Sequence, residues 1–132
     1  MPDLTIHVAE DRALTGAGLL DVLRSRFQAY EVYHRWRSGG QDPNTSIIRK
    51  SATRGVMAKL RPVNQSDESS WWMAGGQVIE LHGVIPLGRM ADFSGALLVL
   101  AAPIATRVDR AAWTEMGEEV TSFLEEKYGN GD

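Results

Sequence analysis

The sequence of 132 residues predicts an α+β fold: an antiparallel or mixed sheet of about five to six strands, with an N-terminal helix and a long C-terminal amphipathic helix packed on it. Several segments alternate apolar and polar residues, which is typical of strands with one buried face. Two segments repeat apolar residues every three or four positions, which is typical of amphipathic helices. A run of consecutive strands between the two helices favours an α+β arrangement.

The first third of the chain supplies a strand, a helix and a second strand. Residues 4–8 alternate, with Leu4, Ile6 and Val8 on one side, and predict the first strand. Residues 15–27 follow a helical period, and Thr15 is suited to cap the first turn because its hydroxyl can accept a backbone N–H. Alternation returns at residues 30–37 and predicts the second strand.

The middle of the chain reads as loops and strands. Residues 38–46 are rich in glycine, proline, asparagine and serine, which favours a loop. Residues 47–61 predict one long strand or two strands joined at Gly55. A polar connection follows at residues 62–70, and residues 71–85 form the next strand region.

Three further elements are expected towards the C-terminus. Residues 86–94 are predicted as a loop, and residues 95–102 are apolar at every position, which indicates a central strand covered on both faces. Thr106 and Asp109 have the spacing of a capping box and predict a helix start. From there an apolar stripe continues to Tyr128, and the glycines of residues 129–131 end the helix.

Composition sets limits on function. The chain has no cysteine, which excludes disulfides, thiolate nucleophiles and cysteine-based metal sites. Neither a secretory signal nor an apolar run of membrane-spanning length is visible, so we expect one domain over residues 1–132, located in the cytoplasm and without a membrane partner. No motif for a cofactor or a metal is apparent, and none is expected.

Charge is unevenly distributed. Residues 35–61 contain seven basic residues opposed only by Asp42, whereas residues 109–132 contain seven acidic residues against Arg110 and Lys127. The predicted strands place Arg35, Arg37, Lys59 and Arg61 on outward faces, where they could bind a polyanion such as a nucleic acid. The acidic helix could instead complement these arginines, within the chain or across a dimer. An isoelectric point of about 5.6 argues against nucleic acid as the first choice.

Two other residue pairs are candidates. Glu80 and His82 lie two residues apart on one strand, so a carboxylate could orient an imidazole for acid–base chemistry. Trp71 and Trp72 point to opposite sides of an extended segment, which leaves one of them available for an interface.

The first functional hypothesis is a non-enzymatic protein-interaction or adaptor-type module that binds a protein partner or a second copy of itself. It depends on an intact core pattern without a convergent catalytic motif. Polyanion binding through the basic strands is the second hypothesis, and a small enzyme that uses Glu80 and His82 is the third.

Overall fold

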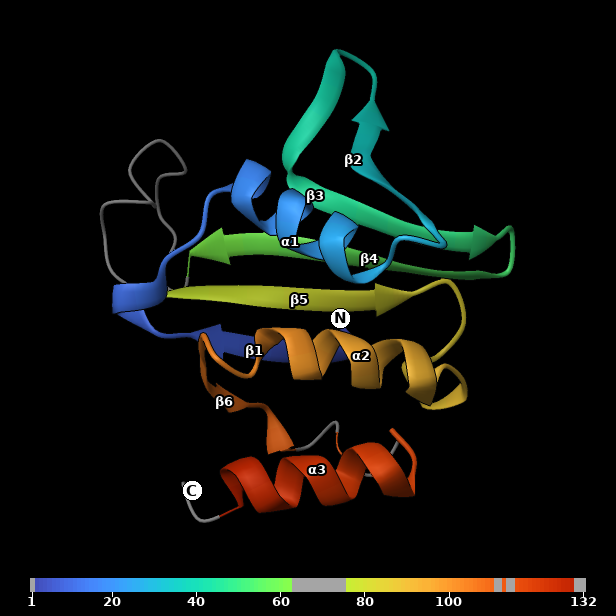
Figure 1. The fold of residues 1–132 in the computed structure, drawn as a ribbon. Helices are drawn as coiled ribbons and strands as arrows, with labels where there is room; N and C mark the ends of the chain where they lie inside the picture. Colours follow the sequence, from blue (N-terminus) through green and yellow to red (C-terminus); the bar gives the residue numbers. More distant parts are fainter. Residues whose placement is uncertain (1, 63–75, 111–112, 114–115, 130–132) are drawn as a thin grey trace.

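The computed structural model describes residues 2–62, 76–110, 113 and 116–129, and these residues have the predicted α+β fold (Figure 1). The strands are β1 (Leu4–Val8), β2 (Glu31–Arg37), β3 (Gly40–Ser51), β4 (Arg54–Pro62), β5 (Gln77–Gly83) and β6 (Ala105–Val108). The α-helices are α1 (Gly16–Arg26), α2 (Ala91–Ala101) and α3 (Glu118–Tyr128), and short 3-10 turns lie at Glu10–Arg12 and Leu87–Arg89.

The six strands form one sheet in the order β2-β3-β4-β5-β1-β6. Every neighbouring pair is antiparallel. Strands β2 to β5 follow one another as a meander, whereas β1 enters between β5 and β6, which come from much later in the sequence. The N-terminal strand therefore occupies an interior position of the sheet.

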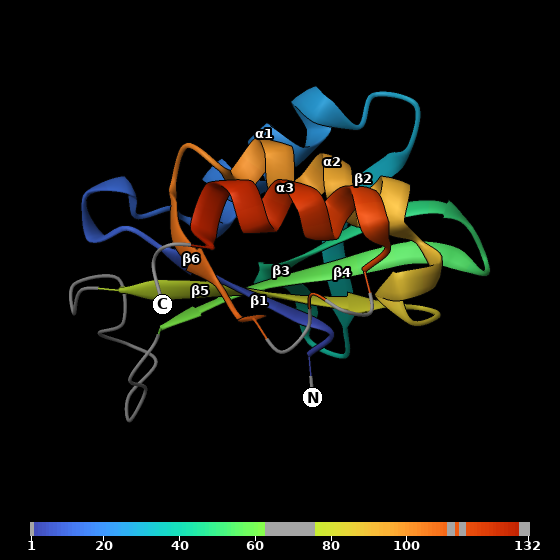
Figure 2. The same ribbon diagram turned by 90° about the horizontal axis from the view of Figure 1, so that it is seen from below.

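The three α-helices lie on the same side of the sheet, and none of the described residues forms a helix on its other side (Figure 2). Side chains of a strand alternate between the two faces, so every second residue points towards the helices. Most of those inward residues are apolar and buried, and Ser46 of β3 and Gln77 of β5 are buried polar residues on the same face. The apolar ones are Leu4, Ile6 and Val8 on β1, Val32 on β2, Ile48 on β3, Val56, Ala58 and Leu60 on β4, Ile79 and Leu81 on β5, and Val108 on β6.

Helix α1 is fixed at its start by two polar side chains. The Thr15 hydroxyl accepts the Gly18 N–H at 2.9 Å, which confirms the predicted cap. The buried amide of Gln77 accepts the Leu14 N–H and donates to the Leu14 carbonyl, each at 2.8 Å. Both Leu14 backbone groups are thus satisfied where the chain crosses the sheet before α1.

The strand predicted at residues 95–102 is wrong, because this segment belongs to helix α2. Its buried residues are Phe93, Ser94, Leu97, Leu98 and Ala101, which share one helical face. A short run that is apolar at every position cannot be assigned by periodicity alone. Alanine and leucine, which dominate the run, are good helix formers.

The helix start predicted at Thr106 is also wrong. Residues 105–108 form β6, which pairs with β1, and the Thr106 hydroxyl donates to the His7 carbonyl at 3.3 Å. Helix α3 begins only at Glu118, after Gly117, whose φ of 89° suits glycine. Long-range pairing with β1, which is invisible in a local pattern, competes here with the capping signal.

The loop predicted at residues 38–46 is mostly strand. Strand β3 begins at Gly40, and a register shift against β2 between His34 and Trp36 accommodates residues 42–45 as a bulge. Strands β3 and β4 are joined at residues 52–53, not at Gly55. Part of the loop predicted at residues 86–94 is the start of α2, and residues 71–75 of the predicted strand lie outside the described residues.

Candidate functional site: a groove on the open sheet face

The side of the sheet opposite the helices, here called the open face, brings together candidate residues from separate strands. On β4, Met57, Lys59 and Arg61 point away from the helices. Strand register sets Met57 opposite His82 and Lys59 opposite Glu80. The predicted basic residues of β4 and the predicted Glu80–His82 pair therefore share one surface.

A groove of about 370 Å³ crosses this face where β2, β3, β4 and the end of β5 meet. Its volume falls at the lower end of the ~300–1,000 Å³ typical of ligand sites. We call it the arginine groove. It is lined by Arg35, Ile47, Arg49, Ser51, Ala52, Gly55, Val56, Met57, His82, Gly83 and Val84.

Apolar side chains and two arginines give the arginine groove its character. Ile47 and Met57 lie opposite each other on β3 and β4 and are only half-buried, and Val84 is exposed. The guanidinium of Arg35 reaches the Met57 sulfur at 3.7 Å, so Arg35 lies along this apolar surface. Arg49 donates from Nε to the Ser51 carbonyl at 3.4 Å. Both contacts are weak in geometry and leave most guanidinium donors available.

Neither groove arginine takes part in any ion pair among the described residues. Both side chains are exposed. A guanidinium offers five N–H donors in a planar fork that matches a carboxylate or phosphate. The groove thus presents two anion-binding groups beside an apolar surface.

The other predicted basic residues are partly neutralised. Arg61 donates to a Glu80 carboxylate oxygen at 3.3 Å. Arg37 lies near the β2–β3 turn, outside the arginine groove, with its guanidinium 3.5 Å from Asp42. The four predicted polyanion-binding residues therefore do not form one uninterrupted cationic surface.

Asp42 is held in its ionised form. Burial alone would raise its pKa, but the Thr45 hydroxyl at 2.7 Å, the Asn44 N–H at 3.0 Å and the charges of Arg37 and Lys59 lower it by more. The pKa of Asp42 consequently lies below its usual value. This carboxylate therefore opposes the two basic residues near it at neutral pH.

The Glu80–His82 pair lacks the geometry of a base and its orienting carboxylate. The Glu80 carboxylate is 3.8 Å from His82 Nε2, which is too long for a hydrogen bond. Glu80 instead contacts Arg61, and His82 lines the arginine groove.

A closer histidine–carboxylate pair, which the sequence did not reveal, joins β1 to β6. His7 Nε2 lies 2.8 Å from Asp109 Oδ1, and Arg107 is 3.4 Å from the same nitrogen. The sequence pattern predicts Asp109 as part of a helix cap, and its residue number differs from that of His7 by 102. Only the β1–β6 pairing brings them together, at the opposite end of β5 from the arginine groove.

No three His, Asp or Glu side chains within the described ranges lie close enough to hold a metal ion. None of the described helices combines the length and apolar character needed to cross a bilayer. Trp71 and Trp72, the predicted interface residues, lie outside the described residues.

The chain matches no family model, no curated protein and no solved structure.

Proposed function

We propose that the protein is a non-enzymatic binding module that uses the arginine groove to bind an acidic segment of a partner protein. The observation that supports this proposal is the position of Arg35 and Arg49, which border a half-exposed apolar surface and take part in no ion pair among the residues described. The sequence predicts an interaction module, and the groove arginines suggest that its partner is acidic.

The groove has the composition of a protein interface. Interfaces combine an apolar centre with a polar rim, and arginine and methionine are enriched in them. Ile47, Met57 and Val84 supply the apolar centre, and Arg35 and Arg49 supply rim donors. A carboxylate that accepts two N–H bonds from one guanidinium gains both strength and orientation.

An acidic protein segment fits better than a nucleic acid. Glu80 and Asp42 lie on the same basic surface beside Arg61 and Arg37, so an extended row of phosphates would meet carboxylates as well as cations. The chain also carries a formal net charge of -3. Polyanion binding through Arg35, Arg37, Lys59 and Arg61 remains the second candidate. These residues lie on β2 and β4, the two strands that flank β3 in the sheet.

Selection from a phage-displayed library of random peptides provides the test. We expect enriched peptides to combine Asp or Glu with apolar residues. Arg35→Gln and Arg49→Gln should each weaken binding of a selected peptide about tenfold, because a charge-assisted hydrogen bond contributes roughly 1.5–3 kcal/mol and 1.4 kcal/mol is tenfold. Arg12→Gln, at an exposed arginine of the Glu10–Arg12 turn, is the matched control and should bind as the wild type does.

The following results would contradict the proposal. Enrichment of peptides without acidic residues, or equal binding by all four proteins, would remove the role of the groove arginines. Binding of a 20-nucleotide single-stranded DNA that falls steeply with salt and is lost in Lys59→Gln would favour the polyanion candidate instead. Sedimentation that shows a dimer dispersed by Arg35→Gln would identify a second copy as the partner.

A further inference from the structure

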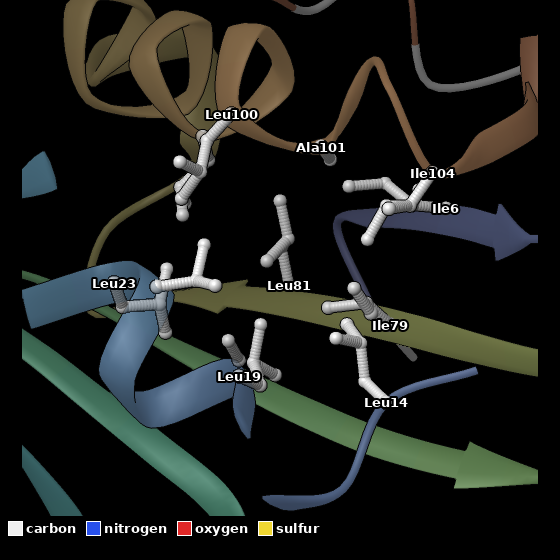
Figure 3. Close-up of a pocket in the computed structure, with 12 residues that line it drawn as sticks. Ile6, Leu14, Leu19, Leu23, Ile79, Leu81, Leu100, Ala101 and Ile104 are labelled. Carbon is white, nitrogen blue, oxygen red and sulfur yellow. The ribbon is translucent and has the colours of Figure 1, made fainter. Parts of the chain in front are cut away.

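A cavity lies on the helix side of the sheet, between α1, α2 and strands β1, β4 and β5 (Figure 3). Its volume is about 120 Å³, which is roughly ten times the ~10–15 Å³ that one water molecule requires. Protein cores contain few voids larger than a water molecule. This space is large enough to hold a small molecule.

The cavity has a purely aliphatic wall. All twelve lining residues are alanine, valine, leucine or isoleucine. Leu19 and Leu23 of α1 face Ile79 and Leu81 of the sheet across it (Figure 3). Without a polar side chain on the wall, a charged or hydrogen-bonding group could not be satisfied inside.

Small residues leave this space unfilled. Ala58 on β4 and Ala101 on α2 are both buried, and both line the cavity where a larger side chain would occupy it. The wall is least buried at Val22, which is 37% exposed, and at Leu14, Leu100 and Ile104, which are partly buried. We expect a small apolar molecule to enter at this part of the wall.

We propose that this cavity binds a neutral apolar group of about the size of benzene, either a whole small molecule or the end of an alkyl chain. An engineered cavity of ~150 Å³ with a similar apolar wall binds benzene and xenon. The site lies on the opposite side of the sheet from the arginine groove, so the two proposals stand or fall separately.

Ligand-induced stabilisation and methyl NMR test the proposal. Benzene and 1-hexanol, each titrated into the wild type, should shift the methyl resonances of Leu19, Ile79 and Leu81, while those of Val84 on the open face stay unchanged. At a free ligand concentration of about ten times the dissociation constant, we expect Tm to rise by about 4 °C, because the ligand binds the folded protein and not the unfolded chain. A stronger response to benzene would assign a ring to the site, and a stronger response to hexanol would assign a chain.

A cavity-filling variant sharpens the test. Ala101→Leu should abolish both responses, whereas Ala17→Leu, the same change at an exposed position of α1, should respond as the wild type does. Leu100→Ala, which enlarges the cavity, should retain binding and accept a larger ring such as naphthalene, and this variant serves if Ala101→Leu fails to fold. Absence of methyl shifts in the wild type, or an equal response from Ala101→Leu, would overturn the proposal.

Discussion

The two faces of the sheet are built on different principles. The face under the helices is mostly apolar, with Leu81 and Ile48 completely buried. The opposite face alternates cations and carboxylates with half-buried Ile47, Met57 and Tyr33. Burial of apolar area stabilises a fold at about 25 cal/mol per Å², whereas exposed ion pairs contribute little. The covered face therefore determines stability, and the open face is available for recognition.

The covered face also contains a weak point. Between α1 and α2 the side chains of Ala58 and Ala101 leave the cavity of about 120 Å³ unfilled. The side chains that line this space lose the dispersion contacts that a filled core would give them.

The largest expected effect comes from removing a side chain on the covered face. Leu81→Ala should lower the free energy of unfolding by about 4 kcal/mol, because the site is completely buried beside a cavity that it would enlarge. His82→Ala, the next residue on the open face, should cost about 1 kcal/mol or less. Urea unfolding measures both, and equal losses would contradict the difference between the faces.

A slightly smaller effect is expected where α1 approaches the bulge of β3. A Cβ at Gly16 would clash with the carbonyl oxygen and carbon of Pro43, which are backbone atoms and cannot turn aside as the end of a flexible side chain can. Gly16→Ala should therefore destabilise by about 3 kcal/mol. Gly95→Ala on α2 is the control: its Cβ would lie in ordinary contact, 3.4 Å from Val120, and helix propensity predicts a gain of up to about 1 kcal/mol. Thermal unfolding that ranks Gly16→Ala above the wild type would refute this packing.

On the open face, Asp42 should give a pH-dependent contribution. Its pKa is lower in the folded state than in the unfolded chain, so the contribution is complete above about pH 4 and disappears as the pH falls through the folded pKa. Urea midpoints from pH 6 to pH 3 should therefore decline less steeply for Asp42→Asn than for the wild type. Parallel curves for the two proteins would show that Asp42 makes no such contribution.

The smallest effect is expected at the groove. Arg49→Gln should change the free energy of unfolding by less than about 0.5 kcal/mol, because the exposed side chain makes one weak hydrogen bond. A loss above 1 kcal/mol in urea unfolding would mean that this arginine supports the fold and not only the surface.

Local patterns in the sequence predicted much of this molecule. Alternation at residues 4–8 and within residues 47–61 and the Thr15 cap are local signals. The structure has strands in both segments and has the cap. The strand prediction for residues 95–102 was wrong because eight consecutive apolar residues fit a buried strand and a buried helix equally well. The helix start predicted at Thr106 was wrong because residues 105–108 form a strand by pairing with β1, about a hundred residues earlier.

The candidate site followed the same rule. Sequence alternation predicted that Lys59 and Arg61 share one face of their strand, and that Glu80 and His82 share one face of theirs. The strand register places both pairs on the open face of the sheet. Arg49 was visible only as part of a basic stretch, since its place beside Arg35 depends on the register of β2, β3 and β4. The His7–Asp109 contact likewise required strand order, which no local pattern contains.

Strand order also has a consequence for how the chain folds. Strands β2, β3 and β4 pair with their sequence neighbours, so this meander closes only short loops. Strand β1 must wait for β5 and β6, and its pairing closes loops of about 70 to 100 residues, which slows folding. During synthesis, β1 therefore leaves the ribosome before either of its partner strands, and Leu4, Ile6 and Val8 cannot reach their native sheet position until β5 and β6 have followed.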